Sequence, residues 1–180
     1  MIGGWNGYSW LPKGGRETSP VSWSKKSVRL IGVLADGWFC IAIIDATNSE
    51  TLKNFLDTIR ADIGKAAMIM DNASYHKSEE TDKYLNDSDG MFECIFLPAY
   101  TPQLNPIEVL WRDLKRALAG SYESIDDLKK AITDIVNSGE LQPPKLFGYM
   151  LSDGIPPSKP VPCTILDLTT PESKIEAATA

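Results

Sequence analysis

The stretch FLPAYTPQLNPIEVLW, residues 96–111, changes from a strand to a helix around a bend that contains proline. Its apolar start is typical of a buried strand, and the following prolines interrupt that strand. Asn105-Pro106 then opens a helix, because proline is favoured in the first helical turn. The helix is predicted to run to about Ala119 with one apolar stripe, and Glu108 falls in its first turn. The sequence therefore places an acidic side chain where a strand–loop–helix unit turns.

The flanking sequence predicts alternating strands and helices. Residues 27–46 are two β-rich runs around Asp36-Gly37, a strong hairpin signal. Helices are predicted at 48–64, 75–90 and 124–139, and strands at 66–70 and 91–98. This order predicts an α/β fold in which an antiparallel hairpin leads into parallel crossover units.

Two acids occupy comparable places in this order. Asp71 directly follows the strand at 66–70, and Glu108 follows the next strand. Chemistry in such sheets gathers beyond the carboxyl ends of parallel strands, and two neighbouring carboxylates need a compensating cation. Mg²⁺ accepts such oxygen ligands, whereas His76 is the only histidine and no cysteine pair suits zinc. The simpler interpretation is that Glu108 complements the helix dipole and that Asp71-Asn72 starts a turn.

Composition indicates one globular domain in a reducing compartment. The chain has 180 residues, of which 43% are hydrophobic and 23% are charged. No apolar run is long enough to span a membrane, and MIGGWNGYSW does not resemble a secretory signal. Cys40, Cys94 and Cys163 form no CxxC pattern. We therefore expect a cytoplasmic protein that does not contact a membrane.

The net charge of -6 gives no support for a nucleic-acid partner, but the basic residues are unevenly distributed. Near the N-terminus a cluster of cations is accompanied only by Glu17; its members are Lys13, Arg16, Lys25, Lys26 and Arg29. Such a cluster suits DNA phosphates, and it is also typical of a solvated surface.

The last residues differ in character from the rest. Residues 152–180 hold five of the twelve prolines and show no lasting period. We expect residues 1–151 to form the domain and residues 152–180 to be a disordered tail.

Two blocks carry a family resemblance. MIMDNASYHKS, residues 68–78, followed by FLPAYTPQLNPIEVLWRDLKR, residues 96–116, resembles the catalytic domain of the mariner-like insertion-sequence transposases of the DDE superfamily. The element WLPKGG at residues 10–15 is similar to a further family element, and the likeness covers roughly residues 5–151.

The resemblance implies an RNase H-like fold that cuts and joins DNA at transposon ends. Asp71 and Glu108 correspond to the second and third acids of the triad, which hold Mg²⁺ or Mn²⁺. The residues that we assign to shaping the site are Asn72, His76, Asn105 and Pro106. The candidate DNA contacts are Lys25, Lys26, Arg112 and Lys115. A simpler role for Arg112 is a surface ion pair with Glu108. For the full-length enzyme the resemblance also implies a homo-oligomer.

The start of the sequence departs from the family pattern in two features. Its first aspartate lies on a strand before the Trp10 element, yet residues 1–9 contain no acid. Asp36 and Asp45 lie in a predicted turn and at a strand end, and the family's helix-turn-helix region has no counterpart. We therefore expect a catalytic-domain fragment without its first strand, with unpaired sheet edges and no activity alone. The alternatives are a non-catalytic regulator that binds DNA or the full-length transposase, and a metal-dependent nuclease unrelated to transposition.

Overall fold

The computed structural model describes residues 2–3, 27–35, 37–88, 90–144, 146 and 164–169. Strands β2 (Arg29–Ala35) and β3 (Trp38–Ile44) pair antiparallel, with Ala35 opposite Trp38. Gly37 adopts a φ of 72° between them, a conformation that glycine reaches without strain. The predicted hairpin is confirmed. Strand β7 (Thr164–Asp167) pairs parallel with the other edge of β3, which gives a three-stranded sheet in the order β2-β3-β7.

A separate pair of parallel strands follows helix α1 (Ser49–Ile63). These are β4 (Ala66–Met70) and β5 (Phe92–Phe96), with Met70 opposite Phe96. Their connection holds a 3₁₀ turn, η1 (Ser74–Lys77), and helix α2 (Glu79–Asp87). One continuous polar helix was predicted here, and that detail is wrong. Ser78 is extended and its side chain accepts a hydrogen bond from the Thr81 N–H, so a new helix begins there.

Two further helices complete the described fold. After the 3₁₀ turn η2 (Pro102–Leu104) come α3 (Ile107–Ala117) and α4 (Ile125–Asn137). Short strands β1 (Ile2–Gly3) and β6 (Ser121–Tyr122) pair antiparallel beside α4. Both predicted helices are confirmed.

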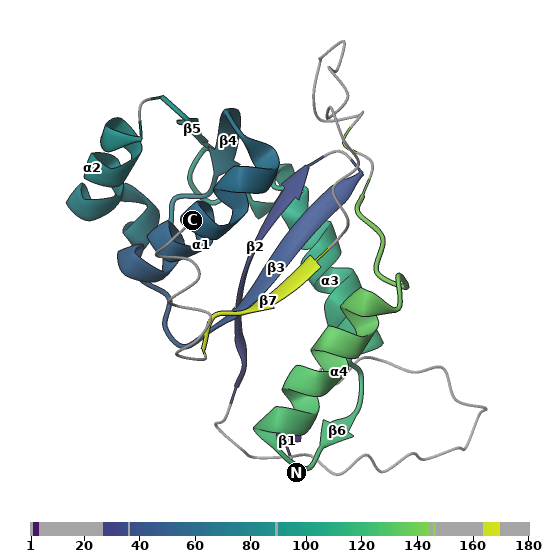
Figure 1. Cartoon of the computed structure of the whole chain (residues 1–180). Coiled ribbons are helices and arrows are strands. Elements are labelled where there is room, and N and C mark those ends of the chain that lie inside the picture. The colour runs from purple at the N-terminus through teal and green to yellow at the C-terminus, as the bar shows by residue number, and fades with distance from the viewer. Residues whose placement is uncertain are drawn as a thin grey trace.

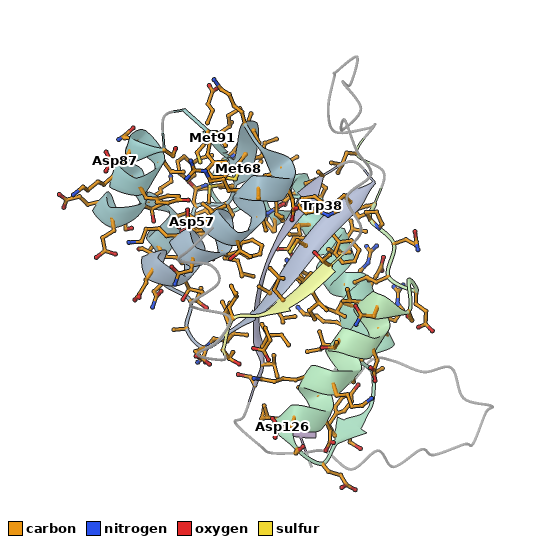
Figure 2. All side chains as sticks on the ribbon, in the orientation of Figure 1. Trp38, Asp57, Met68, Asp87, Met91 and Asp126 are labelled. Atoms are coloured by element: carbon orange, nitrogen blue, oxygen red, sulfur yellow. The ribbon has the colours of Figure 1, made fainter. Side chains whose placement is uncertain are left out.

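Strand β3 is buried along its whole length because each of its faces is covered (Figure 1). On one face lie α1 and the β4–β5 pair; the buried side chains there include Trp38 and Met68, both labelled in Figure 2. On the other face, Phe39 and Ile41 pack against α3 and α4. The predicted apolar faces of α1 and α3 are therefore the ones that reach the core.

The two sheets share a core but no ladder of hydrogen bonds. β2 is the outermost strand of its sheet, and β4 and β5 pair only with each other in the described part of the chain. Within the described residues, the outer strands of both sheets therefore pair on one side only. This arrangement leaves backbone donors and acceptors open to a further strand.

β7 differs from the expected disordered tail. The Leu168 side chain is buried in the core, and its N–H donates to the Ile43 carbonyl at 3.0 Å. The apolar run after Cys163 follows the prolines and pairs with β3, so the expectation is wrong for residues 164–169. The rest of the predicted tail, and the candidate DNA contacts Lys25 and Lys26, lie outside the described residues. No described helix is long and apolar enough to cross a membrane.

Candidate active site

Asp71 lies at the carboxyl end of β4. The Leu97 N–H donates to the Met70 carbonyl at 2.8 Å, which extends the pairing with β5 up to this point. The Asp71 side chain is 55% exposed, and its Oδ1 accepts a hydrogen bond from the Ala73 N–H at 3.0 Å. The carboxylate is therefore held by the turn and remains open to solvent.

His76 holds the same carboxylate from η1. Its Nδ1 lies 2.7 Å from Asp71 Oδ1 and 3.2 Å from the Asp71 carbonyl oxygen. The imidazole is only 12% exposed, so its contact is sheltered while the carboxylate is not. Both contacts described for this carboxylate use Oδ1. His76 and Asp71 are thus in direct contact, and the shaping role assigned to His76 stays a prediction.

The negative charge of Asp71 affects the pKa of a neighbouring side chain. Burial raises the pKa of the Tyr75 hydroxyl, and the negative charge of Asp71 raises that pKa further. The Tyr75 and His76 rings meet edge to face with their centroids 4.2 Å apart. η1 therefore carries two aromatic rings to the side of the carboxylate.

Asn72 connects the ends of the two parallel strands. Its Nδ2 donates to the carbonyl of Leu97, the residue after β5. The Lys77 ammonium lies 4.8 Å from the centre of the Phe96 ring. The turn after β4 is thus fixed to the end of β5, where the chain leaves towards Glu108.

Glu108 lies on α3, and Asn105 and Pro106 set the start of that helix. Asn105 Oδ1 accepts from the Ile107 N–H at 3.4 Å, and its carbonyl accepts from the Glu108 N–H at 3.1 Å. Pro106 has a φ of -63°, which suits a helix start. Glu108 is exposed. Its position depends on how α3 packs on the three-stranded sheet.

The outer face of α3 carries several cations. Arg112 Nε and Arg116 Nη1 each lie 3.4 Å from Asp113 Oδ1, and both arginine side chains are more than half exposed. Arg112 thus pairs with Asp113, not with Glu108 as in the simpler alternative. Lys115 is also exposed on this helix. Exposed ion pairs such as those of Arg112 and Arg116 contribute little to stability.

The donor set suits a hard divalent cation only in part. Asp71 and Glu108 supply exposed carboxylates, and Mg²⁺ commonly takes one or two of these together with water and phosphate oxygens. Among the described residues, no group of three or more His, Cys, Asp or Glu side chains is placed to hold a metal ion. The structure thus brings Asp71, Asn72 and His76 together and leaves Glu108 on a separate element.

Sequence reasoning missed three hydroxyl residues next to this site: Ser49, Ser78 and Thr81. Ser78 followed by acidic residues is a helix N-cap signal that could have been found. Nothing in the local sequence indicates that the Thr81 hydroxyl reaches back to Tyr75.

The RNase H-like fold has a mixed arrangement of strands between helices. Its features include an acid at the end of a parallel strand and a second acid on a later helix. The family model described as DDE superfamily endonuclease matches residues 2–129, and the chain belongs to this family.

Known relatives agree with this assignment. The chain is 25% identical over 122 residues to an uncharacterized 39 kDa protein of insertion element IS630 from Shigella sonnei, covering 65% of this chain and 35% of that protein. The fold is similar to Mos1 transposase in its paired-end complex with the left transposon end, with a TM-score of 0.56, 19% identity, and coverage of 72% of this chain and 42% of that one. The Mos1 strand transfer complex gives a TM-score of 0.52 at 18% identity, with coverage of 74% and 42%. The chain therefore spans less than half the length of each of these relatives.

Proposed function

We propose that this chain is the catalytic part of a DNA transposase, in which Asp71 and Glu108 hold Mg²⁺ or Mn²⁺ for phosphoryl transfer at transposon ends. The observation that carries the proposal is the Asp71 carboxylate: it lies at the carboxyl end of β4, is half exposed, and is held through Oδ1 alone. Membership of the DDE endonuclease family supports it. The Mos1 structures, which are transposase complexes, support DNA as the partner.

Each side chain has a separate task in this proposal. Asp71 Oδ2 is a ligand, while the His76 imidazole and the Ala73 N–H keep Oδ1 in place. Glu108 supplies the second carboxylate from the start of α3. These two carboxylates would hold a divalent cation, which would supply activation of a water or a 3′-hydroxyl and charge stabilisation for an in-line displacement. Arg112 and Lys115 contact the DNA backbone.

We further propose that the chain alone does not cleave DNA at a useful rate. Two carboxylates hold one cation with water, but a pair of cations needs a bridging ligand. In the described residues no third acid joins the set, and residues 1–9 contain no acid. Among the described residues, β2 and β4 each pair on one side only, and an added strand between them is part of this proposal. Loss of a group that stabilises charge typically costs roughly 10²–10³-fold in rate.

A regulator that binds DNA without cutting it is the second candidate. The observation in its favour is the outer face of α3, where Arg112 is 63% and Arg116 is 74% exposed. Such a chain would occupy DNA through phosphate contacts alone, with a strong dependence on salt. It would bind DNA equally well with and without a divalent cation.

The test combines cation binding with cleavage. Mn²⁺ affinity is measured by calorimetry for the wild type, Asp71→Asn and Glu108→Gln, with Asp87→Asn as the matched control. Asp87 is exposed at the outer end of α2 (Figure 2). We expect each site variant to weaken binding at least about tenfold and the control to leave it unchanged. An unchanged Mn²⁺ affinity in Asp71→Asn would rule out the proposed metal site.

Cleavage is measured on supercoiled plasmid and duplex oligonucleotides with Mg²⁺ or Mn²⁺. We expect no nicking above that of an Asp71→Ala variant. Metal-dependent nicking by the wild type that disappears in Asp71→Ala would contradict the proposed inactivity. It would also mean that another acid, most simply Asp45 at the end of β3, completes the site.

A further inference from the structure

Thr81 is a fully buried polar residue that the proposed chemistry does not use. It lies in the first turn of α2 with 0% of its surface exposed. Its Oγ1 donates to the carbonyl of Tyr75 at 2.7 Å, outside its own helix. The side chain therefore links α2 to η1, the turn that carries His76.

The surrounding hydroxyls form a connected chain of hydrogen bonds. Ser49 Oγ lies 2.7 Å from Ser78 Oγ, which lies 3.1 Å from Thr81 Oγ1. Each hydroxyl has one proton to donate. Ser78 Oγ also lies 3.3 Å from the Tyr75 carbonyl oxygen, so its one proton can go either to Thr81 Oγ1 or to that carbonyl. The Thr81 contact with this carbonyl is the shorter one, at 2.7 Å. In either case Ser49 can donate to Ser78, so the chain begins at the first residue of α1.

The end of this chain is one peptide unit from the site. The carbonyl that Thr81 holds belongs to the peptide whose N–H is that of His76, and this N–H donates to the Ala73 carbonyl at 3.0 Å. Both ends of the peptide before His76 are thus fixed. The imidazole that it carries reaches Asp71 Oδ1 at 2.7 Å.

We infer that Thr81 is a positioning residue for Asp71: its buried hydroxyl fixes the peptide before His76, and His76 fixes the carboxylate. The Ser49–Ser78 contact ties this arrangement to the start of α1, so that two helices hold one side chain. The relevance to metal binding rests on the proposed function, whereas the positioning of His76 does not. Thr81 acts through other residues and does not touch the reacting groups.

The test uses the fact that His76 is the only histidine in the chain, so imidazole NMR signals belong to it alone. Thr81→Val keeps the shape and removes the hydroxyl, and Thr81→Ser keeps the hydroxyl. Thr133→Val is the matched control, because Thr133 Oγ1 donates to the Lys129 carbonyl at 3.0 Å within α4. All four 180-residue chains are compared at one and the same pH.

In the wild type we expect the imidazole proton to be on Nδ1, as donation to Asp71 requires. Thr81→Val should move the proton towards Nε2 and broaden the signals, while Thr81→Ser and Thr133→Val should keep the wild-type spectrum. Mn²⁺ affinity should fall about tenfold in Thr81→Val and recover in Thr81→Ser. Melting temperatures are measured in parallel to show whether each variant folds. If Thr81→Val does not fold, the comparison of Thr81→Ser with the wild type decides whether the hydroxyl positions His76.

An unchanged imidazole spectrum in folded Thr81→Val would overturn the inference. Equal spectral changes in Thr81→Val and Thr81→Ser would also overturn it, because shape and not the hydroxyl would then matter. If the spectrum changes in Thr81→Val but the wild type binds no Mn²⁺, the positioning of His76 is upheld. The proposed metal site is then ruled out instead.

Discussion

The indole ring of Trp111 lies directly against the backbone of Gly32. A Cβ at position 32 would stand 2.8 Å from Cη2 and 3.0 Å from Cζ2 of the ring, and 3.1 Å from the Cys40 carbonyl oxygen. Only glycine allows this approach of α3 to β2. The contact fixes the height at which α3, and with it Glu108, lies over the sheet.

Replacing Gly32 with alanine should therefore destabilise the fold. Inserting one carbon into this contact costs about 1–3 kcal/mol by overpacking. Denaturant unfolding of Gly32→Ala measures the loss. In a Trp111→Phe background the smaller ring leaves more room, so the same substitution should cost clearly less. An equal cost in both backgrounds would show that the indole is not the obstacle.

The Leu168 side chain should contribute to stability like a core residue. It is buried to 8% exposure after β7, so truncation to alanine should cost at least about 2 kcal/mol. Leu104→Ala is the matched control, because that side chain is 46% exposed. Thermal unfolding compares the two variants. A similar small loss in both would mean that residues 164–169 do not support the core.

Asp167 should give the fold a dependence on pH. Burial alone would raise its pKa, but hydrogen bonds from Thr169 and the charge of Lys129, 3.7 Å away, outweigh burial and lower the pKa. A lowered folded-state pKa means that the stabilisation is complete above the ordinary aspartate value of about 3.9 and is lost as the pH falls through the folded value.

The variant Asp167→Asn tests the direction of this dependence of stability on pH. It should be less stable than the wild type at neutral pH, and the difference in melting temperature should shrink as the pH falls below the ordinary aspartate value of about 3.9. Other acids titrate equally in both chains and cancel. A difference that stays constant over this range would show that the Asp167 charge does not contribute.

Asn72 should stabilise the link between the ends of β4 and β5. Asn72→Ala removes the bond to the Leu97 carbonyl, and a lost hydrogen bond of this kind costs about 1 kcal/mol. Asn86→Ala, at an exposed position on α2, is the control. Because the same turn carries Asp71, Mn²⁺ affinity should fall along with stability. Loss of stability with unchanged affinity would confine Asn72 to a structural role.

The elements that the sequence predicted well depend on neighbours along the chain. The hairpin around Gly37 follows from turn chemistry, and α1 from its Asn48 cap and buried stripe. Asp71 and His76 were assigned to one site, because a motif placed them five positions apart. Their contact through Nδ1 required the turn η1, which no pattern encodes.

The elements that it missed depend on distant or competing contacts. Ser78 has a side chain that caps a helix better than it continues one, so one predicted helix became η1 and α2. β7 pairs with β3 across 164 - 40 = 124 positions, a parallel register without any local signal. Its prolines made the segment look like a tail, although the four residues of β7 contain none.

The pairing of β7 with β3 also orders events during synthesis on the ribosome. Proteins emerge N-terminal end first, so β3 has its partner β2 early but waits for Thr164 before its second edge can be covered. Until then this apolar strand exposes backbone groups that can pair with another nascent chain. Cellular production of this chain is therefore most exposed to aggregation late in translation, when all other described elements have already been made.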